Sequence, residues 1–432
     1  MLNPQATSYL GIYWDRRLWI IFGLGVLSGF PWVLIGSAMT AWLHESGLSR
    51  TAIGFFGSVF TVYALNFLWA PLLDTVKVPW LNRLGRRRSW IVLLQLSILI
   101  CVIGISFFDP NKSLIATSAF ALVIAISSAT QDTAIDAYRI EILASNEQYK
   151  IPAAAAMATS GWWAGYSLPG AVALILSDLP QFDWGKIYLV MAGFIVLCIG
   201  FVLLIREPVT ESKPNPSDAT KGILYKVSIA PLIEFFRRNG TKIAIAILTF
   251  IFLFKIGEAF LGKMSIVFYK ELGFSNTQIG IYSKLIGWWA IIIFSVIASF
   301  INIRFGIVKG LVISGIAMAA TNLLFTAMAW VGPEEWLFAT AVILDQFTAA
   351  FATVASVSFI SHLTSRLYTA SQYALMASIS NFGRTTLAAF SGLLVDALGG
   401  DWGLFFIITA LMVIPSLLML FLIRHKITER TQ

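Results

Sequence analysis

Apolar stretches of about 20 residues recur along the whole chain and are separated by shorter polar segments. A helix of this length crosses a hydrocarbon core of about 30 Å and satisfies its own backbone hydrogen bonds there. The pattern therefore predicts an all-α membrane protein with twelve transmembrane helices. The predicted spans lie near Leu18–Trp42, Ala52–Leu72, Trp90–Phe108, Ser113–Ala137, Pro152–Leu176, Ile187–Ile205, Ile243–Ile266, Thr277–Phe300, Ile307–Trp330, Leu337–Ile360, Ser371–Leu393 and Leu404–Ile423.

One long polar segment divides these spans into six and six. It begins as a Pro-rich linker and ends in an apolar stripe with basic residues, which is typical of a helix lying on a membrane surface. We expect an N-terminal six-helix bundle at 1–205, a cytoplasmic linker with an amphipathic helix at 206–240, and a C-terminal six-helix bundle at 241–432. Two bundles joined in this way favour a substrate site between them.

Composition supports the membrane assignment. Hydrophobic residues make up 58% of the chain and charged residues 12%, whereas a soluble protein carries about 25% charged residues. Cys101 and Cys198 lie inside apolar spans and are interpreted as small core residues. The three histidines form no cluster with metal-ligand spacing, so we predict no metal site and no cofactor. No secretory signal is recognised at the N-terminus.

The basic residues predict the orientation. With the N-terminus inside, 22 of the 30 Lys and Arg residues fall in cytoplasmic segments, 5 outside and 3 at membrane depth. The positive-inside rule then places both termini in the cytoplasm. This bias accounts for the net charge of +8, and we therefore expect no nucleic acid partner.

Two carboxylates, Asp132 and Asp136, interrupt the fourth span and lie about 40° apart on one helix face. A carboxylate at membrane depth costs about 2.5–3.5 kcal/mol, so it needs a partner, a proton or a water-filled cavity. We predict that both take part in proton coupling, with Asp132 the first choice, and that Arg139 stabilises the charged form of Asp132. For Asp136, pairing with Arg139 leaves a gating or structural role equally open.

Further charges lie at membrane depth in the second half of the chain. Lys255 and Glu258 are adjacent on one helix surface, and Lys284, Asp345 and Arg384 lie in other spans. The cations are candidate anchors for an anionic substrate, and the acids would compensate them. A purely structural network of ion pairs is the alternative.

Aromatic side chains accompany these charges. Trp162, Trp163 and Tyr166 share the fifth span, and Trp288 and Trp289 share the eighth. Flat rings stack well on sugar and peptide surfaces, although ordinary helix packing explains them equally simply. Of these residues, Trp163 is placed in the predicted substrate site.

The loop after the second span carries Asp74, then Gly85 followed by Arg86, Arg87 and Arg88. It resembles the loop signature of the major facilitator superfamily, with a longer insertion than usual between the acid and the glycine. The resemblance implies that these residues and Arg139 gate the cytoplasmic face by latching the two halves. A loop that is basic only because of topology is the alternative. In that fold, every charge at membrane depth named above falls on a helix that lines the central cavity or completes its walls.

A closer resemblance spans nearly the whole chain. The segment 127–143, which includes Gln131, looks like the helix 4 motif of the AmpG-type muropeptide permeases. The likeness continues, in order, at 27–32, 67–74, 85–90, 231–236, 254–260 and 371–376 through Arg384.

This resemblance implies a proton-coupled importer in the bacterial inner membrane, not an enzyme. Its substrates would be peptidoglycan fragments, N-acetylglucosaminyl-1,6-anhydro-N-acetylmuramyl peptides, used in cell-wall recycling and β-lactamase induction. It carries over Asp132 and Asp136 as helix 4 acids, Lys255 and Glu258 as a helix 7 pair, and Arg384; Gln131 joins the predicted substrate site. We expect the protein to be a monomer. Its other expected partners are protons and the lipid bilayer. The alternatives are a related transporter of another acidic substrate, such as acetyl-coenzyme A, or an exporter. A membrane enzyme or a scramblase is disfavoured, because this sequence brings no set of catalytic residues together on one face.

Overall fold

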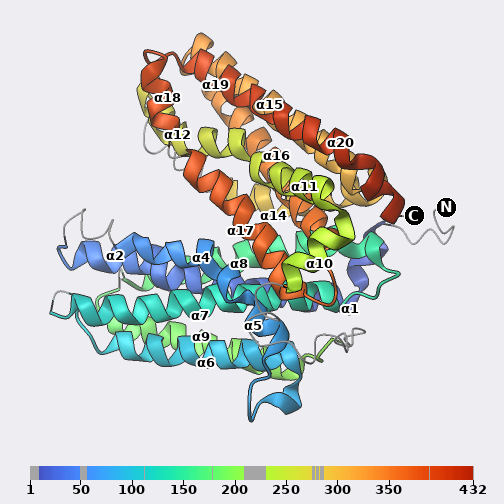
Figure 1. Cartoon of the computed structure of the whole chain (residues 1–432). Coiled ribbons are helices and arrows are strands. Elements are labelled where there is room, and N and C mark those ends of the chain that lie inside the picture. Colours follow the sequence, from blue (N-terminus) through green and yellow to red (C-terminus); the bar gives the residue numbers. More distant parts are fainter. Residues whose placement is uncertain are drawn as a thin grey trace.

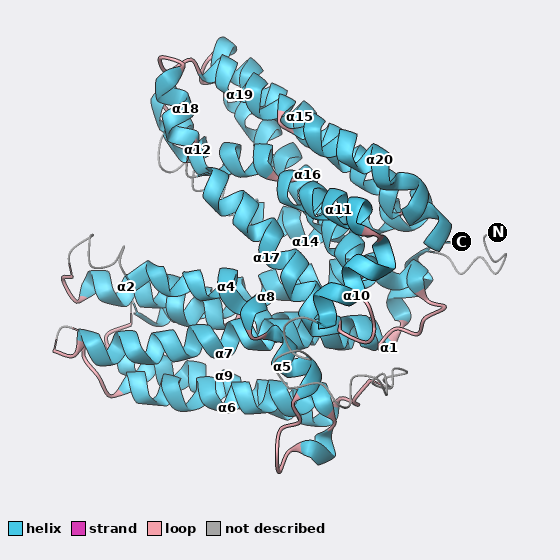
Figure 2. Cartoon of the chain, viewed as in Figure 1, coloured by secondary structure: helices cyan, strands magenta, loops and turns pink. Residues whose placement is uncertain are grey.

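The computed structural model describes residues 9–48, 56–110, 112–177, 179–208, 230–274, 278, 282, 287–388 and 390–431. Within these residues the chain is helical throughout and contains no strand, as Figure 2 shows. Helices of the first half of the sequence form one group, and those of the second half form another (Figure 1). The all-helical class predicted from the apolar pattern is confirmed.

The first group runs from the N-terminus to residue 204. Its elements are η1 (Tyr9–Trp14), α1 (Arg16–Gly29), η2 (Val33–Ser37), α2 (Ala38–Glu45), η3 (Gly57–Thr61), α4 (Val62–Leu65), η4 (Asn66–Leu68), α5 (Ala70–Thr75), η5 (Asn82–Leu84), α6 (Arg86–Ser106), α7 (Leu114–Glu141), η6 (Gln148–Lys150), α8 (Ile151–Ser177) and α9 (Trp184–Leu204).

The second group starts at residue 230. Its elements are α10 (Ala230–Asn239), α11 (Thr241–Leu253), α12 (Ile256–Leu272), α14 (Gly287–Phe305), α15 (Ile307–Val331), α16 (Glu335–Leu363), α17 (Thr369–Ala388), α18 (Ser391–Ala397), α19 (Trp402–Leu411) and α20 (Val413–Thr431).

Eight stretches in the described part are long and apolar enough to cross a membrane. They match eight of the predicted spans to within about four residues at each end. The fifth predicted span corresponds to α8, and the eleventh is divided between α17 and α18. The second span is broken into η3, α4, η4 and α5, and part of the eighth lies outside the described residues.

Glycine allows the closest helix contact of the first half, between α1 and α8. A Cβ atom on Gly29 would lie 2.0 Å from the backbone oxygen of Trp162, and one on Gly161 would lie 2.2 Å from that of Phe22. Small residues let membrane helices approach in this way, since packing rather than water exclusion drives their association. The contact fixes the middle of α8, where Trp162 lies, against the end of α1.

The two groups meet at one end of the molecule and separate toward the other. They meet near α5, α10 and the start of α1, and lie apart at α2 and α18 (Figure 1). We refer to these as the closed end and the open end. Hydrogen bonds between the groups at the closed end include Arg366 Nη2 to the backbone oxygen of Leu143, 2.7 Å.

The predicted amphipathic helix corresponds to α10, while residues 209–229 of the same linker lie outside the described part. α10 exposes Leu232 and Ile233 and buries Phe235. It docks on the second group, where the side-chain amide of Gln372 donates to the backbone oxygen of Pro231 at 3.0 Å. The exact limits of the three predicted domains stay a prediction.

Candidate functional site: a closed-end network and buried intramembrane charges

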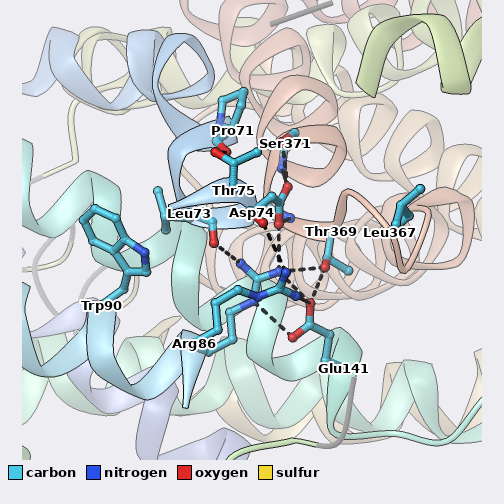
Figure 3. A network of polar contacts seen from close by, with 12 residues as sticks. Pro71, Leu73, Asp74, Thr75, Arg86, Trp90, Glu141, Leu367, Thr369 and Ser371 are labelled. Atoms are coloured by element: carbon cyan, nitrogen blue, oxygen red, sulfur yellow. Dashed lines mark hydrogen bonds and ion pairs between the residues drawn. The ribbon is translucent and has the colours of Figure 1, made fainter. Parts of the chain in front are cut away.

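Arg87 forms the centre of a polar network at the closed end. Figure 3 shows this network and labels the partners Asp74, Glu141 and Thr369. Its side chain is fully buried, and its Nη2 lies 2.8 Å from Asp74 Oδ1 and 2.5 Å from Glu141 Oε1. Its Nε donates to Glu141 Oε2 at 3.0 Å, and its Nη2 also donates to Thr369 Oγ1 at 2.9 Å. One guanidinium therefore ties α5 and α7 of the first group to α17 of the second.

Asp74 completes this link because it accepts hydrogen bonds at the start of α17. Its carboxylate accepts from the backbone N–H groups of Ala370 at 3.2 Å and Ser371 at 2.9 Å, and from the Ser371 hydroxyl at 2.6 Å. The first N–H groups of a helix have no partner within the helix, and they favour a negative charge. Asp74 thus binds across the two groups, as a latch requires.

Arg86 and Arg88 lie differently from Arg87. Arg86 joins the network, with Nη2 3.3 Å from Glu141 Oε1. Arg88 instead donates to the backbone oxygens at the end of α9, those of Val202 and Leu203, at 3.0 and 2.7 Å. The structure thus places Arg88 between elements of the first half rather than across the two groups.

Glu207 holds the start of α6, which carries the three arginines. Its carboxylate accepts from the backbone N–H of Arg87 at 2.6 Å and of Arg88 at 3.0 Å. Burial raises the pKa of Glu207, and these two hydrogen bonds oppose that shift. Gly85 precedes the helix at φ +95°, a conformation that glycine adopts without strain.

Arg139 forms a second connection between the groups. It pairs with Asp136 at 3.0 Å, as the spacing of three residues predicts, and donates to Ser361 Oγ at 2.9 Å. Its guanidinium also lies 5.2 Å from the ring centre of Tyr373. The predicted pairing of Asp136 with Arg139 is confirmed, whereas the recorded partners of Arg139 do not include Asp132.

Asp132 lies one helical turn deeper on α7 than Asp136. Its Oδ1 accepts a hydrogen bond from Ser28 of α1 at 2.7 Å. No ion pair to Asp132 occurs among the described residues. A half-buried carboxylate that no cation in the described part of the chain keeps charged is well suited to exchange a proton.

Gln131 faces the interior of the first half. Its Oε1 accepts from Gln95 at 2.6 Å, its Nε2 donates to the backbone oxygen of Leu27 at 3.0 Å, and its side chain is fully buried. These bonds join α7 to α6 and α1. The position favours a packing role over contact with a substrate.

Lys255 lies at a break between α11 and α12, where it precedes the first residue of α12. Its Nζ lies 3.0 Å from Glu258 Oε2 and donates to Thr353 Oγ1 of α16 at 2.8 Å. The sequence spacing predicts the first of these contacts. Interrupted helices at membrane depth are typical of substrate and ion sites in transporters.

Arg384 and Asp345 belong to the same group of charges. Both lie near enough to Lys255 for their charges to act on it. The Arg384 Nε atom is buried and has no recorded partner among the described residues. Lys284, the remaining predicted member, lies outside the described residues.

Aromatic rings from three helical segments gather beside α1 in the first half. Trp32 lies 5.7 Å from Trp162 and 4.7 Å from Tyr63, and Trp162 stacks on Tyr166 at 5.5 Å with 19° between the rings. Trp163 contacts Trp162 edge-on at 5.2 Å. The Trp32 Nε1 donor is buried and has no recorded partner among the described residues.

Comparison with known proteins decides the family. The sequence model of the Major Facilitator Superfamily matches residues 21–268 and 256–432. The chain is 33% identical over 417 residues to "Putative transporter AmpG 4" of Rickettsia conorii, covering 96% of this chain and 98% of that one. It is 30% identical over 424 residues to "Anhydromuropeptide permease" of Escherichia coli strain K12, covering 98% and 83%. The chain belongs to the AmpG-type permeases of the Major Facilitator Superfamily.

Solved structures agree with this fold. The major facilitator transporter FucP superposes with a TM-score of 0.69 over 95% of this chain and 98% of that one, at 13% identity. The proton:xylose symporter XylE gives a TM-score of 0.68 over 95% of both chains, also at 13% identity. Membership of the permease family makes the protein a multi-pass membrane transporter rather than an enzyme.

Several residues at these sites were not predicted from the sequence. Glu141, Thr369 and Ser371 complete the closed-end network, Glu207 caps α6, and Trp32 carries a buried donor. Glu141 gave a usable signal, because it is an acid that lies five residues after Asp136, just beyond the end of the predicted fourth span. Thr369 and Ser371 gave none, because nothing local marks a hydroxyl that contacts the other half.

Proposed function

We propose that this permease imports peptidoglycan fragments, N-acetylglucosaminyl-1,6-anhydro-N-acetylmuramyl peptides, by proton symport with alternating access. The observation that carries the proposal is the 30% identity, over 98% of this chain, to a protein named anhydromuropeptide permease. The protein would act in the bacterial inner membrane, where it would supply cell-wall recycling and the signal that induces β-lactamase.

The intramembrane side chains support a substrate of this chemistry. A muropeptide combines sugar rings with peptide carboxylates. The rings of Trp32, Trp162 and Trp163 offer faces on which sugars stack, and a buried indole donor would bond a sugar hydroxyl. Lys255 and Arg384 offer cations for the carboxylates.

We further propose that the closed end faces the cytoplasm. The basic residues Arg86, Arg87, Arg88, Arg237 and Arg238 lie there, as the positive-inside rule requires. In this orientation both termini are cytoplasmic, and the described conformation is open to the periplasm. Asp74, Arg86, Arg87 and Arg139 then act as the cytoplasmic gate.

Uptake of labelled anhydromuropeptide into proteoliposomes tests the function. We expect an inward proton gradient to drive accumulation of chemically unchanged substrate. Uptake that ignores the gradient would contradict symport. If the folded protein carries no muropeptide under either condition, the proposed substrate is wrong, and the alternative is another acidic substrate carried by a transporter of this fold.

Asp132→Asn tests the coupling residue. Because the amide cannot take up a proton, we expect gradient-driven accumulation to be lost while exchange of labelled for unlabelled substrate continues. Asp109→Asn is the matched control, since Asp109 is an exposed acid paired with Lys112 at the open end. Full accumulation by the Asp132 variant would overturn the assignment.

Arg384→Gln tests the placement of the peptide carboxylates. A hydrogen bond to a charged group contributes about 1.5–3 kcal/mol, so the KM for a peptide-bearing substrate should rise about tenfold or more. The KM for the disaccharide without its peptide should stay near that of the wild type. An equal rise in KM for both substrates would mean that Arg384 does not bind the peptide carboxylates.

A further inference from the structure

A cavity of about 300 Å³ lies between the two halves at the closed end. Its walls come from the end of α7, η6 and the start of α8 on one side, and from α10 and the end of α16 on the other. Small-molecule sites in proteins start at about this size. The cavity can therefore hold a small ion, and it exists only while the halves are together.

Basic side chains dominate the charged groups on the described walls. Arg139, Arg238 and Arg366 line the cavity together with His362, and Glu147 is the carboxylate among them. The Glu147 charge is already balanced, because its carboxylate forms ion pairs outside the cavity wall. The balance of charge on the walls therefore favours an anion.

Arg366 provides the charge that such an anion would neutralise. Arg139 and Arg238 have carboxylate partners of their own, but no ion pair to Arg366 occurs in the described part of the chain. Arg366 Nη2 donates to the backbone oxygen of Leu143 at 2.7 Å, which uses one of the five N–H donors of a guanidinium. The other donors form a planar fork that matches a carboxylate or phosphate.

The cavity is separate from the intramembrane charges. Arg139 lies seven residues beyond Asp132 on α7, and Ser361 lies eight residues beyond Thr353 on α16. At about 1.5 Å per residue, the cavity lies roughly 10–12 Å from those charges toward the closed end. The hydrogen bond from Arg139 to Ser361 at its wall joins the two halves.

We propose that this cavity binds a small oxyanion, a carboxylate or a phosphate, that enters from the compartment at the closed end. Bound there, the anion bridges Arg366 of the second half and Arg139 of the first. It binds the closed arrangement and loses its site when the halves part, so it shifts the equilibrium toward closure of that end. A high anion concentration on that side would then slow transport.

The inference requires alternation between two conformations but no particular substrate. A conformational measurement therefore tests it independently of muropeptide uptake. Spin labels at positions 112 and 334, on exposed turns at the open end of the two halves, report how far the halves separate there. The labels are placed in a background in which Cys101 and Cys198, both buried, are replaced by alanine.

Gln148 can be replaced without removing a side-chain hydrogen bond or ion pair seen in the described part of the chain. It lines the cavity and is exposed. Gln148→Glu places a negative charge at the wall, and Gln148→Lys places a positive one. A neighbouring charge that is partly exposed has a modest effect, so we expect changes of up to about fivefold in apparent anion affinity, in opposite directions. Lys112→Gln, at the far end, is the control for net charge in a parallel thermal unfolding series.

The experiment titrates inorganic phosphate against chloride at constant ionic strength, with the full chain in nanodiscs of phosphatidylcholine. We expect phosphate to increase the population with separated open ends, and to raise the Tm, in a saturable way. A parallel series in phosphatidylglycerol without phosphate separates a lipid headgroup from a free ion as the source of the oxyanion. A response confined to either series supports the site and identifies its occupant.

Two results would overturn the proposal. One is a distance distribution that neither phosphate nor phosphatidylglycerol changes in the wild type. The other is an equal response in wild type, Gln148→Glu and Gln148→Lys, which would mean that the anion acts away from this cavity. Loss of muropeptide uptake with an intact phosphate response would instead contradict only the proposed substrate.

Discussion

At the scale of single residues, the complete burial of Arg87 makes it the side chain on which the closed-end network depends. Its donors face Asp74, Glu141, Thr369 and the backbone oxygen of Leu73. A buried charge is stable only while its partners and hydrogen bonds are complete. Removing the cation leaves two acids in the same buried space.

We predict that Arg87→Met destabilises the protein by about 3–5 kcal/mol, because it leaves Asp74 and Glu141 without their shared counter-ion. Chemical unfolding in a neutral detergent measures the change. Arg83→Met is the matched control, since Arg83 is exposed in the same loop and should change stability by less than about 0.5 kcal/mol. Equal losses in both variants would argue against the network.

Glu147 carries a prediction about acid stability. Hydrogen bonds from Arg17 lower the pKa of Glu147 from 4.5 to about 2, and Lys150 adds to the effect. A pKa lowered by folding means that the carboxylate stabilises the fold above about pH 4.5 and that this contribution is lost as the pH falls toward 2.

We therefore expect Glu147→Gln to cost no more than about 1 kcal/mol at pH 7, because the pair is partly exposed. The difference in Tm between wild type and variant should shrink below pH 4.5. Glu334→Gln, an exposed acid at the open end, should show no such trend. A difference that stays constant down to pH 2 would contradict this assignment.

Local spacing predicts contacts within one helix well, and contacts between halves poorly. The pairs Lys255–Glu258 and Asp136–Arg139 follow from residues three apart on one helix. The partner of Asp74 at Ser371 is 297 residues away, so only the packed fold brings the two together. The predicted roles of these residues in gating and binding stay predictions.

At the scale of helices, the close approach of α1 and α8 depends on the absence of side chains. Gly161 packs against the backbone of Phe22, and Gly29 against that of Trp162. The same contact positions Trp162 and its ring partners. A change that separates these helices should therefore affect both stability and the aromatic face.

We predict that Gly161→Ala destabilises the protein by about 1–3 kcal/mol, because the new methyl group would lie 2.2 Å from a backbone oxygen. Gly200→Ala on α9 is the control. A Cβ atom on Gly200 would meet no atom of another helix within 4 Å, and alanine favours the helix by up to about 1 kcal/mol. In thermal unfolding, the Tm should therefore fall for Gly161→Ala and stay the same or rise for Gly200→Ala.

Apolar length predicts where helices lie but not where they break. Eight predicted spans agree with the structure closely. The second span is divided into short segments, with Trp69 and Pro71 near the last break, and Lys255 lies in a break within the seventh. Hydropathy averages over such interruptions, because broken and unbroken helices need the same apolar surface.

At the scale of the whole molecule, the hydrogen bonds that join the two halves in the described part of the chain concentrate at one end. Asp74, Arg87, Arg139 and Arg366 all reach the second half there. The equilibrium between the two conformations therefore depends strongly on this end. Weakening it should favour opening toward the compartment that we propose to be the cytoplasm.

Asp74→Ala tests this dependence. It removes the bonds to Ala370 and Ser371, and we expect the ratio of closed to open states to fall about tenfold, as 1.4 kcal/mol implies. Distances between labels at positions 112 and 334 measure the ratio. Thr75→Ala, whose hydroxyl donates within its own helix to the backbone oxygen of Pro71, should leave the distances unchanged. A similar shift in both variants would rule out the latch.

The anchors on either side of the linker have a consequence for how the protein can be built. Glu207 binds the start of α6, and Tyr138 donates to the backbone oxygen of Arg206, so the segment before the linker is anchored in the first half. Gln372 binds Pro231 and Glu234, so α10 is anchored in the second. The halves therefore recognise one another through side chains and not through their covalent join. Two separately synthesised polypeptides, divided between these anchors, would retain every interaction described here.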